Sequence, residues 1–155
     1  MVIRKTTNDD IDDIVKLLHL VLKVHHKIRK DLFKEDGSKF SHKEIEDIIK
    51  DDNTPVFVCE ENNKVIGYLF AKIIITKDNP ITPDIKRFHI EDLCVDEMNQ
   101  NKHVGTKLME YAFEYAKKIG CYNVTLDVWE GNDRAIEFYK KQGLKTYKYR
   151  MEKIL

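Results

Sequence analysis

A polar loop followed by a helix that starts with a glycine is the clearest place for chemistry in this sequence. The stretch EDLCVDEMNQNKHVGTKLMEYA, residues 91–112, passes from an apolar run through this loop into an amphipathic helix with Gly105 in its first turn. Glycine costs a helix roughly 1 kcal/mol relative to alanine. The free N–H groups and partial positive charge of a helix N-terminus suit an anion such as phosphate, and Gly105 would let that anion approach the backbone. Tight packing of the helix against a strand would also explain Gly105.

The elements that must position this loop follow from hydrophobic periodicity. Apolar residues spaced three and four apart predict helices over 7–24, 41–49, 103–119 and 132–143. Runs rich in β-branched and aromatic residues predict strands over 2–6, 55–60, 64–75, 86–95, 121–129 and 145–155. The charged segment 25–41 is expected to be a loop with an irregular helical piece. The order of elements predicts one mixed α/β domain over residues 1–155, with an antiparallel hairpin and a parallel strand–helix–strand unit.

Composition excludes several classes of protein. The 155 residues carry 27 basic and 27 acidic side chains, so bulk charge does not favour a nucleic-acid partner. No apolar run approaches the length of a membrane span or a secretion signal. Cys59, Cys94 and Cys121 are scattered without CxxC spacing, which indicates reduced thiols in a cytoplasmic protein. The adjacent His25 and His26 would point in different directions on a helix, so no metal site is expected.

The loop resembles the acetyl-CoA-binding motif of the GNAT family of N-acetyltransferases, which reads Gln/Arg-x-x-Gly-x-Gly/Ala between a strand and a helix. Gln100 takes the first position and Gly105 the last, while His103 stands where the first glycine usually lies. A side chain at position 103 is expected to need ordinary backbone angles and to lie near the bound pyrophosphate.

A second stretch, NDRAIEFYKKQGLK, resembles the helix that follows in the same family, where Asn-x-x-Ala-x-x-Phe-Tyr-x-x-x-Gly-Phe is common. The matching positions are Asn132, Ala135, Phe138, Tyr139 and Gly143, with Leu144 in place of the usual phenylalanine. Two motifs in the family's order, on the expected elements, are more specific than either alone. On these motifs the chain is identified as a member of the GNAT family.

The resemblance implies a GNAT fold, in which a central mixed and partly splayed β-sheet is flanked by helices. Two parallel strands, near residues 93–95 and 125–128, would part at their C-terminal ends and admit the pantetheine arm of acetyl-CoA. The arm would pair with the freed main chain, and the pyrophosphate would rest on the N–H groups of the loop and helix start. The expected cofactor-binding residues are Leu93, Cys94, Val95, Gln100, Asn101, Lys102, His103, Val104, Gly105, Thr106, Asn132, Arg134 and Tyr139.

The implied reaction is direct transfer of the acetyl group from the thioester to a primary amine in a ternary complex. Because most amines are protonated at neutral pH, a general base helps attack, and the departing thiolate benefits from a proton donor. Each such group contributes about 10²–10⁴ in rate. Tyr139 matches the family's general acid. Glu91 is the preferred base, because related enzymes place a glutamate in a similar Glu-Asp pair, and Asp127 is the alternative.

The acceptor side would be formed by the segment HHKIRKDLF and the loop around 77–86. The segment is similar to one found in some members of the family, and the candidate acceptor-binding residues are His26, Arg29, Asp31, Phe33 and Trp129. The sequence leaves the acceptor open between an amine-bearing small molecule and a peptide N-terminus. A homodimer also stays open, because dimers are common among similar proteins. The main alternative function is a non-catalytic module that binds acetyl-CoA as a sensor, which His103 in the glycine position would favour.

Overall fold

The computed structural model describes residues 1–155, and its helices and strands follow one another much as the periodicity predicts. In chain order the elements are β1 (Val2–Lys5), η1 (Asn8–Asp10, a 3₁₀ turn), α1 (Ile11–Ile28), α2 (His42–Lys50), β2 (Val56–Glu61), β3 (Lys64–Thr76), β4 (Ile85–Val95), η2 (Glu97–Lys102, a 3₁₀ turn), α3 (Val104–Lys118), β5 (Asn123–Leu126) and α4 (Asp133–Lys141). None of the helices is both long and apolar enough to cross a membrane.

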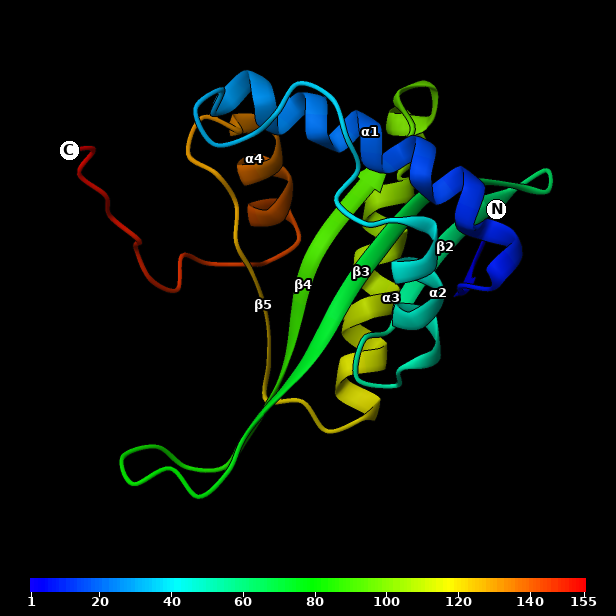
Figure 1. The fold of residues 1–155 in the computed structure, drawn as a ribbon. Helices are drawn as coiled ribbons and strands as arrows, with labels where there is room; N and C mark the ends of the chain where they lie inside the picture. Colours follow the sequence, from blue (N-terminus) through cyan, green and yellow to red (C-terminus); the bar gives the residue numbers. More distant parts are fainter.

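The strands form one five-stranded sheet in the order β1-β2-β3-β4-β5. The first four strands pair antiparallel with their neighbours, and β5 pairs parallel with β4 (Figure 1). Since β4 and β5 run in the same direction, the chain must cross back between them, and α3 makes that crossing. The mixed α/β fold class predicted from the sequence is confirmed.

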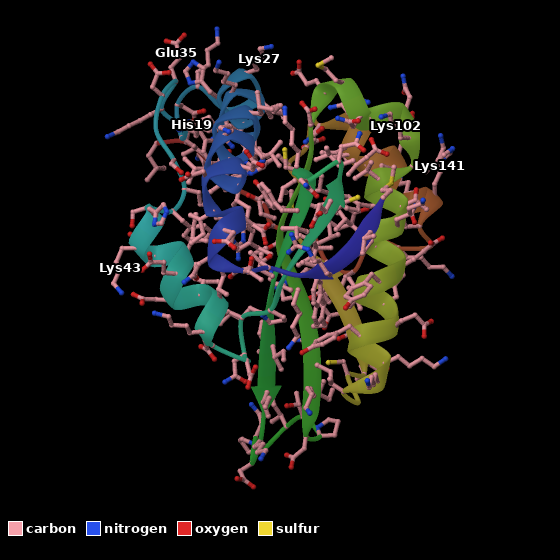
Figure 2. All side chains as sticks on the ribbon, turned by 90° about the vertical axis from the view of Figure 1, so that its right-hand side faces the viewer. His19, Lys27, Glu35, Lys43, Lys102 and Lys141 are labelled. Atoms are coloured by element: carbon pink, nitrogen blue, oxygen red, sulfur yellow. The ribbon has the colours of Figure 1, made fainter.

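Helices cover both faces of the sheet, with α1 and α2 on one side and α3 on the other (Figure 2). Successive side chains of a strand point to opposite faces, and β3 shows this clearly. Tyr68 and Phe70 lie in the apolar cluster beneath α1, whereas Leu69 and Ala71 lie in the cluster beneath α3. The sheet is therefore buried on both faces around β3, and this rigid centre positions the neighbouring β4.

Two predicted helix starts are confirmed by their capping contacts. The backbone N–H of Thr7 donates to Asp10 at 2.8 Å, and Ser41 Oγ accepts from the N–H of Glu44 at 3.1 Å. The first helix continues to Ile28, four residues beyond the predicted end, so the start of the charged segment 25–41 is helical.

The predicted strand 145–155 is wrong. The residues after α4 pair with no strand and remain exposed, as Tyr149 (85% exposed) and Met151 (90% exposed) show. The alternation of apolar and polar residues that suggested a strand is real, but alternation alone does not supply a neighbouring strand. The predicted strand 121–129 is also shorter than expected, because its pairing ends at Leu126.

Candidate active site

The parallel strands β4 and β5 part before β4 ends. Their last paired residues are Ile90 and Leu126, and β4 then continues to Val95 with no partner on that side (Figure 1). The other side of this segment stays paired with β3, where Leu93 lies opposite Leu69. The main chain of residues 91–95 is thus held in extended form by one neighbour and left open toward the other. The splayed sheet that the resemblance implied is confirmed.

A β-bulge at Glu91 sets the direction of the side chains beside this opening. In the register of β3 and β4, Ala71 pairs with Ile90 and Phe70 pairs with Asp92, so Glu91 has no partner. The extra residue reverses the alternation. Ile90 packs on the α3 side of the sheet, whereas Asp92 is buried on the α1 side. Glu91 itself is exposed at the edge of the opening.

Asp92 is a buried carboxyl group that sequence reasoning missed. The hydroxyl of Tyr68 donates to Asp92 Oδ2 at 3.1 Å. Burial raises the pKa of Asp92, and the nearby Lys39, Tyr68 and His25 oppose this shift only in part. Strict alternation after Ile90 would have placed Asp92 toward α3, and no feature of the sequence announces the bulge that turns it toward α1.

Tyr139 lies close to the same segment of β4, because α4 folds back beside it. Burial raises the pKa of Tyr139 to about 12, with smaller contributions from Asp92 and Cys94. Its phenol is therefore fully protonated at neutral pH. The hydroxyl makes no hydrogen bond to another residue, which leaves its proton free for a bound molecule.

The loop before α3 turns through a left-handed residue. His103 has φ 57° and ψ 23°, and this conformation joins η2 to the first turn of α3. The expectation that a residue other than glycine would keep ordinary angles here is wrong. A histidine in this region costs of order 1–3 kcal/mol, and the turn between the two helical segments imposes that cost. His103 therefore holds the conformation that a glycine adopts easily.

Gly105 is explained in part by packing. A Cβ atom at this position would lie 3.1 Å from Cζ of Phe138, closer than side chains normally approach. The first turn of α3 therefore needs a glycine so that α4 can pack against it. Gln142, the residue directly after α4, also donates from Nε2 to Thr106 Oγ1 at 3.3 Å, which joins the end of α4 to α3. The packing explanation is thus supported, though with a helix rather than a strand as the neighbour.

The same helix start still offers free backbone donors. The N–H of Lys107 donates to the His103 carbonyl at 3.0 Å, and the amides before Lys107 precede the first helical hydrogen bond. The side chain of Val104 is fully buried, so this residue can offer a ligand only its backbone. Lys102 Nζ is paired with Glu61 Oε2 at 2.9 Å, which holds the loop against β2.

The expected residues at the start of α4 differ in their roles. Asn132 Oδ1 accepts from the N–H of Ala135 at 3.3 Å, so this side chain caps α4. Its amide nitrogen has no partner in the protein. Arg134 is exposed in the first turn of the helix and remains available to a phosphate.

Asp127 follows β5 and is 81% exposed. Its Oδ2 lies 3.9 Å from Nε2 of His89, and Nδ1 of that histidine lies 2.9 Å from Thr125 Oγ1. The sequence analysis did not single out His89. The two groups lie within the distance of an ion pair but too far apart for a hydrogen bond.

Most of the expected acceptor residues meet at the C-terminal end of α1. The rings of Phe33 and Trp129 meet edge to face with centroids 5.5 Å apart, and the Arg29 guanidinium lies 5.7 Å from the Trp129 ring. Arg29 is also paired with Asp31 through two hydrogen bonds of 2.9 and 2.7 Å. Of the two histidines, His25 packs its ring against Phe33, whereas the sequence predicted that His26 would face the acceptor.

His26 is not part of this aromatic group. Its Nδ1 lies 2.8 Å from the carbonyl oxygen of Phe33, so it fixes the loop backbone. The ring of His25 lies 5.0 Å from that of Phe33 and is close enough to Asp92 for the two charges to interact. Burial lowers the pKa of His25. His25 thus connects the aromatic group to the buried carboxyl group of β4.

A mixed sheet whose parallel strands part beside an exposed helix start is the architecture of the GNAT fold. Residues 22–144 match the acetyltransferase (GNAT) family. The chain is 35% identical to an uncharacterised N-acetyltransferase of Methanocaldococcus jannaschii, over 91% of this chain and 59% of that protein. It is 26% identical to an N-alpha-acetyltransferase of Sulfurisphaera tokodaii, over 94% and 81% of the two chains. The chain belongs to the GNAT family.

A solved structure shows the same fold over all residues of this chain. A tetramutant of a Bacillus halodurans protein, BH1408, is 28% identical, with a TM-score of 0.95 and 100% of both chains covered. The M. jannaschii relative is longer, since the match spans 59% of its length.

Proposed function

We propose that this protein transfers the acetyl group of acetyl-CoA to a primary amine by direct attack in a ternary complex. The observation that carries the proposal is the opening between β4 and β5, beside which lies the protonated phenol of Tyr139. Family membership supports acetyl transfer in general. The role proposed for each residue follows from its position around this opening.

The cofactor would be held mainly by backbone groups. The free main chain of Leu93–Val95 suits the amides of a pantetheine arm, which would add to β4 like a short strand. The pyrophosphate would lie on the N–H groups from Asn101 to Thr106, at the positive end of α3. Arg134 would provide a cation for a phosphate. Acetyl-CoA would supply the activated acetyl group.

Tyr139 is the proposed general acid. As the amine attacks the carbonyl carbon, the carbon–sulfur bond breaks and the departing thiolate takes the phenol proton. The phenol is protonated at neutral pH, so its proton is present when the carbon–sulfur bond breaks. An N–H near Leu93 and Cys94 would stabilise the charge that develops on the thioester oxygen.

Three carboxylates are candidates for the base. Glu91 is exposed at the bulge, and Asp127 lies beside His89. We favour Asp92, because burial raises its pKa and so makes it a stronger base than an exposed carboxylate, and because its neighbour His25 contacts the aromatic group at Phe33. The proton of the amine would pass to Asp92 directly or through a water molecule.

The proposed acceptor is an amine-bearing small molecule or a peptide N-terminus. Phe33 and Trp129 offer an aromatic surface. The faces of these rings and the candidate carboxylates Glu91, Asp92 and Asp127 would attract a cationic amine. The name of the S. tokodaii relative, an N-alpha-acetyltransferase, favours a peptide N-terminus. Residues 1–155 would act as one unit, and the free cysteines suit a reducing compartment such as the cytoplasm.

A non-catalytic acetyl-CoA sensor is the second candidate. It was favoured by a histidine in the glycine position of the loop, but His103 adopts the left-handed conformation that such a glycine provides. The backbone path needed for binding is therefore kept, and His103 no longer argues against catalysis.

The test combines cofactor binding with turnover. Acetyl-CoA at 100 times its dissociation constant should stabilise the fold by about 2.7 kcal/mol, measured by thermal unfolding. Release of free CoA should then be followed across peptides, polyamines and aminoglycosides. Binding together with turnover of at least one amine would support the enzyme. Binding with no turnover across the panel would favour the sensor, and no binding would refute both.

A further inference from the structure

The face of the sheet on the α1 side continues below the opening between β4 and β5. Side chains alternate between the two faces of a strand, and Phe88 and Ile90 pack beneath α3. Arg87 and His89, which alternate with them, therefore lie on the α1 side. α1 crosses the upper ends of β3 and β4, and no helix lies in front of the lower lengths of β4 and β5 (Figure 1). This part of the face borders the acceptor side of the opening.

Polar side chains form two rows across the strands on this face. In the upper row, Lys72 of β3 pairs with His89 of β4, and His89 Nδ1 lies 2.9 Å from Thr125 Oγ1 of β5. In the row below, Arg87 Nε donates to Asn123 Oδ1 at 3.1 Å. Lys72 and Arg87 are thus diagonal neighbours on adjacent strands, a separation that two long side chains can bridge.

Arg87 is held in place by neutral groups. Besides the bond to Asn123, its Nη2 donates to the Tyr147 hydroxyl at 3.4 Å, and its guanidinium lies 5.7 Å from the Tyr147 ring. No ion pair of the chain includes Arg87 or Lys72. A guanidinium fixed by neutral partners keeps its charge for an anion, and its planar shape suits a carboxylate.

The charges along the acceptor side therefore form two zones. The opening carries the carboxyl groups of Glu91, Asp92 and Asp127. The two rows below it carry Lys72 and Arg87 and no acidic side chain. Each strand residue advances about 3.3 Å, so the two rows lie about 7 Å and about 13 Å below Glu91 along β4. A ligand with a positive end and a negative group farther along would match both zones.

Given acetyl transfer to an amine as the proposed function, we infer that the acceptor is a peptide whose third or fourth residue is acidic. Lys72 and Arg87 bind this acidic side chain while the N-terminal amine lies at the opening. An extended peptide advances about 3.4 Å per residue, so its third and fourth residues lie about 7–10 Å from the first, at the depth of the two cations. A single amino acid is too short to span the two zones.

The first test measures peptide binding without turnover, by calorimetry on the protein alone and on the protein saturated with CoA. A peptide with aspartate at its third or fourth position and otherwise neutral residues should bind about fivefold more tightly than its asparagine analogue. Aspartate at the eighth position should give no gain, because it lies beyond Arg87. Equal affinity for the aspartate and asparagine peptides, or an equal gain from the eighth position, would overturn the proposal.

The second test assigns the preference to this face of the sheet. Lys72→Glu and Arg87→Gln should each remove most of the gain from aspartate and leave the affinity for the asparagine peptide unchanged. Lys118→Glu, at an exposed lysine of α3 on the opposite face, is the matched control and should keep the gain. If Lys72→Glu and Arg87→Gln both keep the full gain, or if Lys118→Glu loses as much of it, the proposal is refuted.

Turnover of the same peptides separates the acidic acceptor from acetyl transfer itself. Release of CoA from acetyl-CoA should show a higher kcat/KM for the aspartate peptide than for its asparagine analogue. Equal kcat/KM values would leave acetyl transfer standing and refute the acidic acceptor. Selective binding of the aspartate peptide without release of CoA would refute acetyl transfer to this peptide and support the binding site.

Discussion

The two sides of the proposed active site are built from different parts of the chain. The cofactor side consists mainly of backbone, namely the free main chain of residues 91–95 and the first turn of α3. The acceptor side consists of side chains, with Phe33, Trp129 and the buried Asp92 brought together from three segments. A backbone site depends less on residue type than a side-chain site does, and His103 keeps the left-handed conformation that a glycine adopts easily. The first side should therefore carry what the family shares, and the second what is particular to this protein.

The largest effect on turnover is expected when the proposed proton donor between the two sides is removed. Tyr139→Phe should lower kcat by about 10²-fold or more, because the thiolate then leaves without a proton. Affinity for acetyl-CoA should change little, since the ring is kept. Steady-state kinetics and calorimetry measure the two quantities. Tyr122→Phe, at a tyrosine that is 76% exposed before β5, is the matched control. Equal turnover of Tyr139→Phe and wild type would remove Tyr139 from the mechanism.

On the cofactor side, stability should depend on the side-chain volume at position 105. Gly105→Val would push a side chain into Phe138, so the free energy of unfolding should fall by about 1–3 kcal/mol, as measured by urea unfolding. In a Phe138→Ala background, where the ring is absent, Gly105→Val should lower the free energy of unfolding by less than it does in the wild type. Full stability of Gly105→Val would show that α3 and α4 are not packed as described.

A substitution on the acceptor side should weaken amine binding and leave cofactor binding unchanged. Phe33→Ala removes the ring that meets Trp129, which should weaken binding of the amine by about 1 kcal/mol. The KM for the amine should therefore rise several-fold, while the KM for acetyl-CoA stays constant. Leu32→Ala, at the exposed neighbouring residue, serves as the control. An equal rise in both KM values would mean that the two sides are not distinct.

The smallest effect expected is a change in the pH dependence of stability. Because burial raises the pKa of Asp92, its contribution to stability is complete below the unfolded-state pKa and is lost as pH rises through the folded-state pKa. Asp92→Asn removes this dependence. Its free energy of unfolding, relative to wild type, should therefore increase from acidic toward neutral pH. Asp127→Asn, at an 81% exposed carboxylate, controls for the loss of one charge. A difference that stays flat with pH would contradict the buried position of Asp92.

Sequence predicted the helices α3 and α4 better than the positions of the side chains around the opening. The cofactor loop and α4 follow from local motifs and periodicity, which act within about twenty residues and leave a readable pattern. Asp92 escaped notice because a bulge at Glu91 depends on pairing with β3. The left-handed His103 was likewise unexpected, since the turn between two helical segments outweighs its local preference. The segment 145–155 shows the same limit, because its alternation predicts a conformation but not a partner.

The most direct test is a crystal structure with CoA bound. The pantetheine arm should lie between β4 and β5 and pair with the main chain of Leu93 and Val95, with the pyrophosphate on the amides of residues 101–106 and sulfur near the Tyr139 hydroxyl. A closed gap between these strands with CoA bound elsewhere would contradict the account at its centre.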